Sequence, residues 1–168
     1  MTQVLATLAL LTGGALEDVD NPDYKSWSKF KAGAMVKYKM VAEAGGTKTE
    51  SEMSLKLVEL TGEKAVVETA FLFGGNALPG ERNPIPARIK RVEPQTDPAP
   101  PTKEGEEELE MAGKKVKTRW VETTVEQAAA KAVRKVWMTT EIPGGLARSE
   151  TRSRAGTVTQ VAVEWRKE

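Results

Sequence analysis

Residues 35–73 read MVKYKMVAEAGGTKTESEMSLKLVELTGEKAVVETAFLF. The first ten of these residues alternate between apolar and mostly charged side chains, and the apolar set is Val36, Tyr38, Met40 and Ala42. A period of two is typical of a β-strand that buries one face. The stretch therefore predicts a half-buried strand at its start.

Two turns divide the rest of this stretch into two further strands. The adjacent glycines of Ala44-Gly45-Gly46-Thr47 accept the positive φ angles of a tight hairpin, and Thr61-Gly62-Glu63-Lys64 predicts a second turn. The apolar phase of the strand between them shifts near Leu57, which predicts a β-bulge there. Residues 64–73 are dense in β-forming residues. The whole stretch therefore predicts a three-stranded antiparallel meander.

A short helix is expected just before this meander. Asn21-Pro22-Asp23 resembles a helix start, because proline suits the first helical turn. Tyr24, Trp27 and Phe30 recur every three residues and therefore share one face of a helix that ends near Phe30. We predict that this aromatic face closes the core.

A proline-rich segment follows the meander. Residues 74–103 hold seven of the nine prolines, and proline is excluded from central strands and helix interiors. We therefore expect a long connection here, inserted into a single β domain of residues 16–168. Its second half, EPQTDPAPPTK (93–103), predicts an extended disordered spacer, with a binding lid as the alternative.

The last third of the chain predicts five more strands. Alternation over 106–120 indicates a hairpin. Residues 126–131 predict a short helical or irregular connection between the next two strands. Ile142-Pro143-Gly144-Gly145 predicts a type II turn. Strands at 147–154 and 157–166 follow. The expected fold is mainly β: a curved antiparallel sheet or incomplete β-barrel of about eight strands, with one short N-terminal helix.

Residues 1–15 are typical of a secretory signal peptide. Val4 to Leu11 form an uncharged apolar run, which is shorter than the roughly 20 residues that a membrane span needs. Gly13 and Ala15 are small enough for cleavage after Ala15. The alternative is a first strand or a short buried helix. The pattern predicts a periplasmic or secreted bacterial protein with no membrane span in its mature chain.

The composition excludes several classes of function. The 168 residues contain no His and no Cys, which removes Ser-His-Asp, Cys-His and His–metal chemistry and disulfide bonds. The 25 Lys and Arg residues nearly balance the 24 Asp and Glu residues, so broad electrostatic attraction to nucleic acid is not expected. We predict no cofactor and no nucleic-acid partner.

Two acidic clusters fail as chemical sites. Glu106, Glu108 and Glu110 occupy alternate positions, as on the solvated face of a strand, so a carboxylate-dependent hydrolase is the weakest hypothesis. The run 18–23 lacks the glycine and the bidentate Glu of a calcium loop. We therefore predict no catalytic residue, no metal ligand and no enzymatic activity.

The candidate binding residues are large apolar side chains in the expected strands. Core packing explains the tryptophans better than stacking on nucleobases does. We expect the concave face of the sheet to hold an apolar or lipid group. The eight candidates are Tyr38, Met40, Leu55, Phe71, Phe73, Trp120, Trp137 and Trp165.

One segment carries a family resemblance. Lys135-Val136-Trp137-Met138, followed after a turn by Gly145-Leu146-Ala147-Arg148-Ser149-Glu150, resembles paired strands of periplasmic lipoprotein-carrier-like proteins of the outer-membrane lipoprotein-sorting type. The chain is also similar, over most of 21–164, to uncharacterised exported bacterial proteins with a W-x-x-x-E-I-P-G-G-L hairpin. The resemblance implies an unclosed antiparallel barrel whose apolar face binds acyl chains. The chain departs from the carriers by lacking long helices to line that face.

Two hypotheses from different classes follow. The first is a noncatalytic exported domain that binds an apolar or lipid ligand, or another envelope protein, on its concave face. The second is a structural, envelope-associated module that binds no small ligand and covers this face with its own N-terminal segment.

Overall fold

The computed structural model describes residues 17–91, 101–127 and 130–168. Within these ranges the chain forms one helix and eleven strands. In chain order they are β1 (Asp18–Asp20), α1 (Pro22–Trp27), β2 (Met35–Ala44), β3 (Thr47–Leu60), β4 (Lys64–Phe73), β5 (Asn76–Pro86), β6 (Arg88–Lys90), β7 (Thr102–Met111), β8 (Lys114–Gln127), β9 (Ala130–Met138), β10 (Leu146–Ser153) and β11 (Gly156–Arg166).

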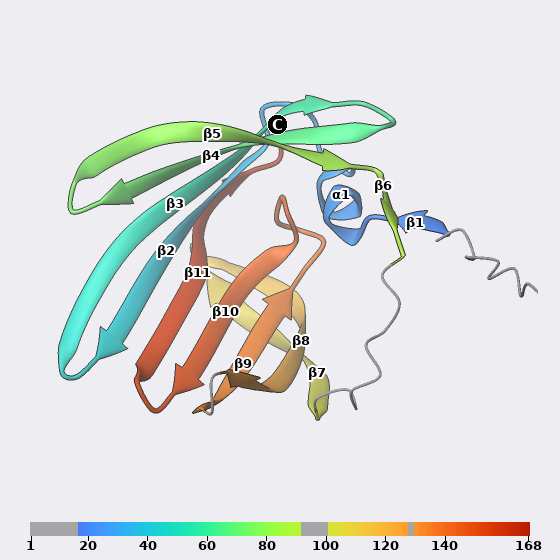
Figure 1. The fold of residues 1–168 in the computed structure, drawn as a ribbon. Coiled ribbons are helices and arrows are strands. Elements are labelled where there is room, and N and C mark those ends of the chain that lie inside the picture. Colours follow the sequence, from blue (N-terminus) through green and yellow to red (C-terminus); the bar gives the residue numbers. More distant parts are fainter. Residues whose placement is uncertain (1–16, 92–100, 128–129) are drawn as a thin grey trace, which may run out of the picture.

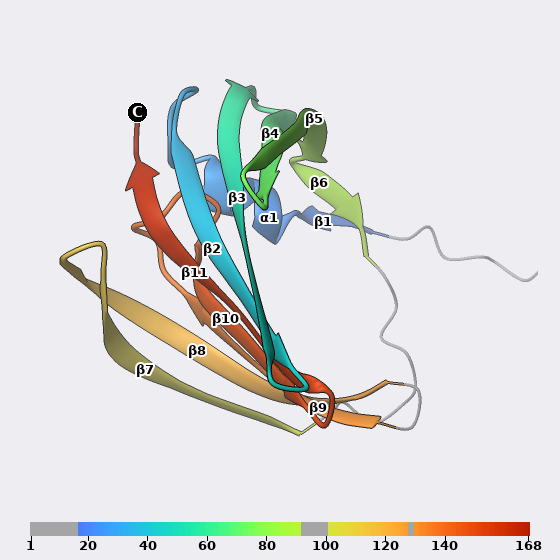
Figure 2. The same cartoon turned by 90° about the vertical axis from the view of Figure 1, so that its left-hand side faces the viewer.

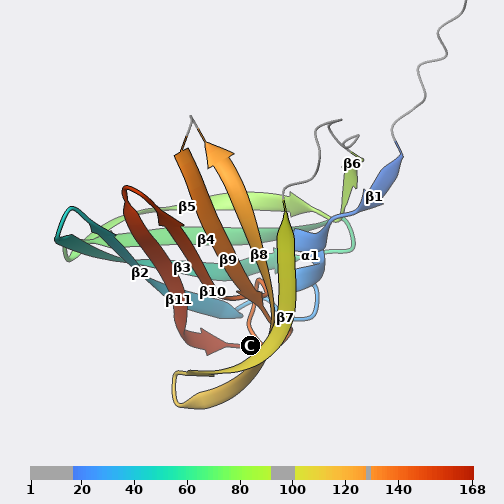
Figure 3. The same cartoon turned by 90° about the horizontal axis from the view of Figure 1, so that it is seen from below.

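Nine of these strands form one open antiparallel sheet, which confirms the predicted fold class. The order is β5-β4-β3-β2-β11-β10-β9-β8-β7, so the last strand, β11, lies beside β2 in the middle. Strands β1 and β6 pair separately. The sheet bends around α1 (Figure 1) and twists so strongly that β4–β5 and β8–β9 run at a steep angle to one another (Figure 3).

The helix α1 covers one end of one sheet face, which we call the inner face. Its N-terminus is capped by Asn21, whose side chain accepts a hydrogen bond from the Asp23 backbone N–H and donates another to the Pro86 carbonyl. Trp27 and Phe30 are buried and Tyr24 is partly buried in the core. The predicted aromatic plug is therefore confirmed, although the α-helix itself ends at Trp27.

The predicted turns and bulge of the first meander are also confirmed. Gly45 and Gly46 have φ angles of 57° and 80° in the β2–β3 turn, which is the left-handed region that glycine tolerates. The register of β3 against β4 shifts between Leu57 and Glu59. The bulge lets the strand keep apolar side chains on its buried face on both sides of the shift.

The expectation for 74–103 is wrong over its first half. Residues 76–86 form β5 and residues 88–90 form β6, rather than a connection. Prolines are tolerated in β5 because it is an edge strand, where half of the backbone N–H groups need no partner in the sheet. The disordered spacer predicted for 93–103 falls mainly in 92–100, which lies outside the described residues; β7 begins at Thr102.

The predicted short helical or irregular connection at 126–131 also needs correction. β8 continues to Gln127 and β9 starts at Ala130, so the two strands occupy nearly all of this segment, while 128–129 lie outside the described residues. The main sheet has nine strands rather than about eight because it includes β5. The predicted signal peptide, 1–15, also lies outside the described residues.

Candidate functional site

The structure places five of the eight candidate residues on the inner face of β2, β3 and β4. Residues that pair directly across antiparallel strands share a face. In one cross-strand row, Phe71 pairs with Met53, which pairs with Tyr38. In the next row on the same face, two residues further along each strand, Phe73 and Met40 both pair with Ser51. Leu55 pairs with Val36 in the next row toward α1.

Trp120 and Trp137 lie on the opposite, outer face. They pair with each other across β8 and β9. The β9 residue in the same cross-strand row as Met40 is Val136. Because neighbouring residues of a strand point to opposite faces, Trp137 points away from the inner face. The Trp120 ring covers Gly105, where a Cβ atom would approach the ring to 2.7 Å. The eight candidates therefore do not form one surface.

Trp165 is separated from the other candidates by an irregularity in β11. The register shifts between Ala162 and Glu164, and Trp165 then pairs with Val36. Its ring contacts Lys114, whose Nζ lies 5.4 Å from the ring centroid. Trp165 thus shares the face of Val36 near the end of β11, and it contacts Lys114 of the β7–β8 hairpin. Figure 2 shows this hairpin beside β11.

The half of the inner face nearest α1 is filled by the protein's own core. Val36, Tyr38, Leu57 and Val67 are buried there. The Tyr38 hydroxyl donates a 3.0 Å hydrogen bond to the Leu146 carbonyl, and burial raises the pKa of Tyr38. Leu55 is partly buried against the same core. Tyr38 and Leu55 therefore act as core residues.

Beyond Tyr38 the inner face is open. Several apolar side chains there are exposed: Phe71 (40%), Phe73 (57%), Leu78 (54%) and Val158 (51%). We call this region the open inner surface. By the strand register it comprises Met40, Ala42, Thr49, Ser51, Met53, Phe71, Phe73, Leu78, Ser149, Thr151, Val158 and Gln160.

The open inner surface carries no charged side chain, whereas the outer face behind it is covered with charges. On that outer face Glu50 pairs with Lys39 at 2.7 Å and with Lys48 at 2.8 Å. Hydrogen bonds from both lysines lower the pKa of Glu50 to about 2. Charged side chains mark a face that stays in water. The uncharged open inner surface is therefore the face suited to being covered.

Sequence reasoning missed a charged cleft of about 340 Å³ on the outer face. Trp137 donates its indole N–H to Glu107, and Lys135 Nζ lies 3.5 Å from the same carboxylate oxygen. The Trp137 hydrogen bond, aided by Lys135, lowers the pKa of Glu107. Lys135 Nζ also lies 4.0 Å from the Trp120 ring centroid. The sequence held one signal for this cleft. Alternation puts the Glu107 carboxylate on the same side of its strand as the apolar Leu109, whereas Glu106, Glu108 and Glu110 share the other side.

A second network lines the floor of this cleft. Glu150 is buried and accepts a 2.7 Å hydrogen bond from Arg148, and Arg152 pairs with its other oxygen. The Arg148 guanidinium also stacks 4.9 Å from the Trp137 ring centroid. The ionic groups of the cleft are thus engaged with one another, as expected where buried charges must be paired. This arrangement stabilises the packing of β8, β9 and β10.

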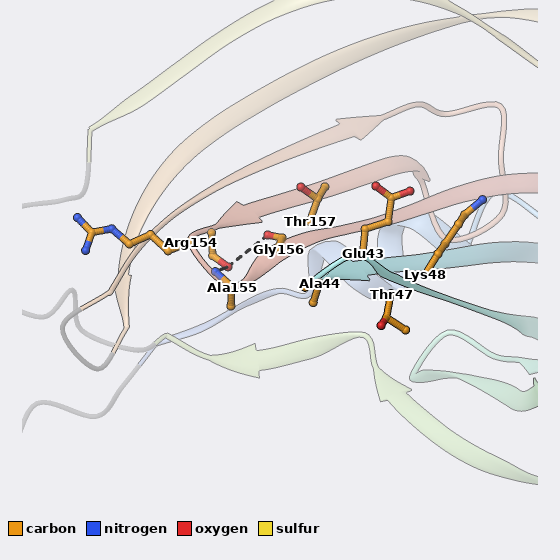
Figure 4. Close-up of a pocket in the computed structure, with 11 residues that line it drawn as sticks. Glu43, Ala44, Thr47, Lys48, Arg154, Ala155, Gly156 and Thr157 are labelled. Carbon is orange, nitrogen blue, oxygen red and sulfur yellow. Dashed lines mark hydrogen bonds between the residues drawn. The ribbon is translucent and has the colours of Figure 1, made fainter.

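A further groove, of about 410 Å³, lies between two hairpin ends. It is formed by the β2–β3 and β10–β11 turns, with Glu43, Lys48 and Arg154 at its margins. Lys48 and Arg154 extend in different directions (Figure 4), so the charged groups do not converge on one point. The groove is a consequence of two neighbouring turns and presents no organised set of ligand contacts.

The comparisons with known proteins show the fold and no family. No family model matches the chain, and no curated protein is significantly similar to it. Two solved structures share the fold. One is a candidate lipoprotein from Parabacteroides distasonis, with 10% identity, a TM-score of 0.52, and coverage of 83% of this chain and 98% of that one. The other is a candidate exported protein with a YmcC-like fold from Bacteroides fragilis, with 10% identity, a TM-score of 0.53, and coverage of 84% and 99%.

The resemblance to lipoprotein carriers is therefore supported only as far as an open antiparallel sheet that is shared with these two proteins. The one helix of the described residues, α1, is not long and apolar enough to cross a bilayer.

Proposed function

We propose that this protein is a noncatalytic exported module that binds an apolar group on its open inner surface. The observation that carries the proposal is the contrast between the two faces of the same strands. Exposed aromatic and aliphatic side chains gather on the open inner surface, which carries no charged side chain, and ion pairs cover the reverse of the same strands. Contiguous apolar surface on a soluble domain marks an interaction site.

Export is supported by two separate features. The apolar run at 4–11, with small residues before the expected cleavage point, has the pattern of a secretory signal. The two solved structures that share the fold are described as a candidate lipoprotein and a candidate exported protein. We propose a location outside the cytoplasm, in the periplasm or secreted.

The chemistry of the outer cleft favours a noncatalytic protein. A hydrolase that uses paired carboxylates needs one of them protonated near neutral pH, with a raised pKa. Glu107 instead has a lowered pKa, because Trp137 and Lys135 both stabilise its ionised form. Glu150 is engaged by two arginines. Glu107 therefore does not suit a general acid.

Titration with an apolar fluorophore that brightens in a nonpolar environment tests the proposal. Phe71→Ser/Phe73→Ser should weaken binding by about 10-fold or more, because burying an aromatic side chain contributes about 1.5–3 kcal/mol. The matched control is Leu72→Ser. Leu72 is 37% exposed on the same strand but points to the outer face, so its loss should leave binding unchanged.

Two outcomes would contradict the proposal. Equal binding by wild type and the double variant would place the probe elsewhere. Absence of binding by wild type would favour the structural module that carries no small ligand. Circular dichroism of each variant verifies that the sheet is intact.

A further inference from the structure

Two exposed charged side chains stand on the inner face beside the open inner surface: Glu81 on β5, which pairs with Thr69, and Arg134 on β9. Arg134 on β9 pairs with Thr151 on β10 and with Thr123 on β8. Thr151 pairs in turn with Val158 on β11. Arg134 is therefore on the inner face, two strands from Val158. At about 4.8 Å per strand, its backbone lies roughly 10 Å from that of Val158.

Arg134 has no partner within the described part of the chain. Its side chain is exposed and makes no hydrogen bond or ion pair there. The next residue, Lys135, faces outward and pairs with Glu107. The inner-face neighbours of Arg134 across the strands, Thr151 and Thr123, are uncharged. Arg134 is thus an exposed cation between the uncharged open inner surface and the Arg119–Glu104 ion pair on the inner face of β7 and β8.

The surface between Arg134 and Phe73 suits a flexible chain more than a compact ligand. The row from Val136 through Ser149, Gln160 and Met40 to Phe73 crosses from β9 to β4. Its side chains are apolar or uncharged and polar, with the exposed apolar groups concentrated toward β4 and β5. A long apolar tail could lie along this row with a charged end at Arg134.

From this juxtaposition we infer that the ligand of the open inner surface is a fatty acid, held with its carboxylate at Arg134 and its acyl chain directed toward Phe73. The inference rests on the proposed function and names its ligand class. The guanidinium fork matches a carboxylate in two parallel hydrogen bonds. A single unpaired arginine balances the single negative charge of a carboxylate.

Palmitate and its uncharged analogue 1-hexadecanol separate the roles of head and tail. Both are titrated below their aggregation concentrations into wild type and Arg134→Gln, and binding is followed by displacement of the apolar fluorophore. We expect Arg134→Gln to weaken palmitate binding by about 10-fold and to leave 1-hexadecanol binding unchanged, since only palmitate makes a charge-assisted contact. Arg134→Lys should restore part of the affinity.

The matched control is Arg154→Gln. Arg154 is exposed in the turn between β10 and β11 and also makes no ion pair within the described residues. Its loss lowers the net charge equally, so palmitate binding should not change. If Arg154→Gln weakened palmitate binding as much as Arg134→Gln, a general charge effect would replace the inference.

The test also separates failure of the inference from failure of the proposed function. Unchanged palmitate binding by Arg134→Gln, with loss of both compounds in Phe71→Ser/Phe73→Ser, would overturn the fatty acid assignment and leave an apolar site. Absence of binding of either compound to wild type would overturn both. Tighter binding of dodecyl phosphate than of dodecanoate would assign the head group to a phosphate instead.

Discussion

At the scale of single residues, Tyr38 links the two halves of the sheet. It lies on β2, is 1% exposed, and its hydroxyl reaches the carbonyl of Leu146 at the start of β10. The alternating pattern around residue 38 predicts an inward side chain, but nothing local identifies the acceptor, which lies 108 residues away. Tyr38 is therefore part of the core rather than of a ligand surface.

Tyr38→Phe should lower the free energy of unfolding by about 1–2 kcal/mol, because the Leu146 carbonyl would lose a buried donor. Urea unfolding measures this difference. Tyr24→Phe is the control: its hydroxyl also donates to a carbonyl, that of Thr61, but at an exposed site where water can replace it. Equal losses for the two variants would contradict the structural role assigned to Tyr38.

At the scale of elements, the turn between β9 and β10 shows how far local sequence predicts structure. The pattern Ile142-Pro143-Gly144-Gly145 predicts a positive φ at Gly144, and the observed value is 79°, with the Gly145 N–H donating to the Ile142 carbonyl. The sequence does not reveal that this turn lies against Trp27 of α1. A Cβ atom at Gly144 would lie 2.9 Å from the Trp27 ring.

Gly144→Val should therefore be destabilised for two reasons. Backbone strain at a positive φ costs on the order of 1–3 kcal/mol, and the side chain must also displace Trp27. Thermal unfolding should show a clearly lower midpoint, accompanied by a shift of tryptophan emission. Gly62→Ala is the control, because its φ is not positive and its Cβ would meet no atom within 4 Å, so its midpoint should stay near that of wild type. A wild-type midpoint for Gly144→Val would refute this account of the turn.

The remaining errors of the sequence interpretation arise where strands meet. Edge strand β5 escaped recognition because proline excludes only central positions, and edge position is a property of the assembled sheet. Their size and apolar character place Trp120 and Trp137 with Tyr38 among the candidates. Which face Trp137 occupies relative to Tyr38, however, depends on the register of β2, β11, β10 and β9. The register shifts between Leu146 and Arg148 and between Ala162 and Glu164 break the simple alternation that such a grouping assumes.

At the scale of the whole molecule, the two faces of the sheet have different roles. The outer face is covered by ion pairs and by the β7–β8 hairpin, with Met111 and Val116 buried. The inner face is closed at one end by α1 and open at the other. Uncharged inward positions in β2 and β3 could be recognised from alternation alone. That part of the inner face stays uncovered is evident only from the structure, because α1 spans just Pro22–Trp27 and covers one end of that face.

Methyl NMR of methionine-labelled protein during a palmitate titration would locate the bound apolar group on the sheet. Met40 and Met53 belong to the open inner surface, whereas Met35 on the outer face and the buried Met111 at the end of β7 do not. If the open inner surface binds the apolar group, the Met40 and Met53 methyl signals shift with saturation while those of Met35 and Met111 stay in place. Saturable shifts at Met35 or Met111 with unmoved Met40 and Met53 signals would contradict the account.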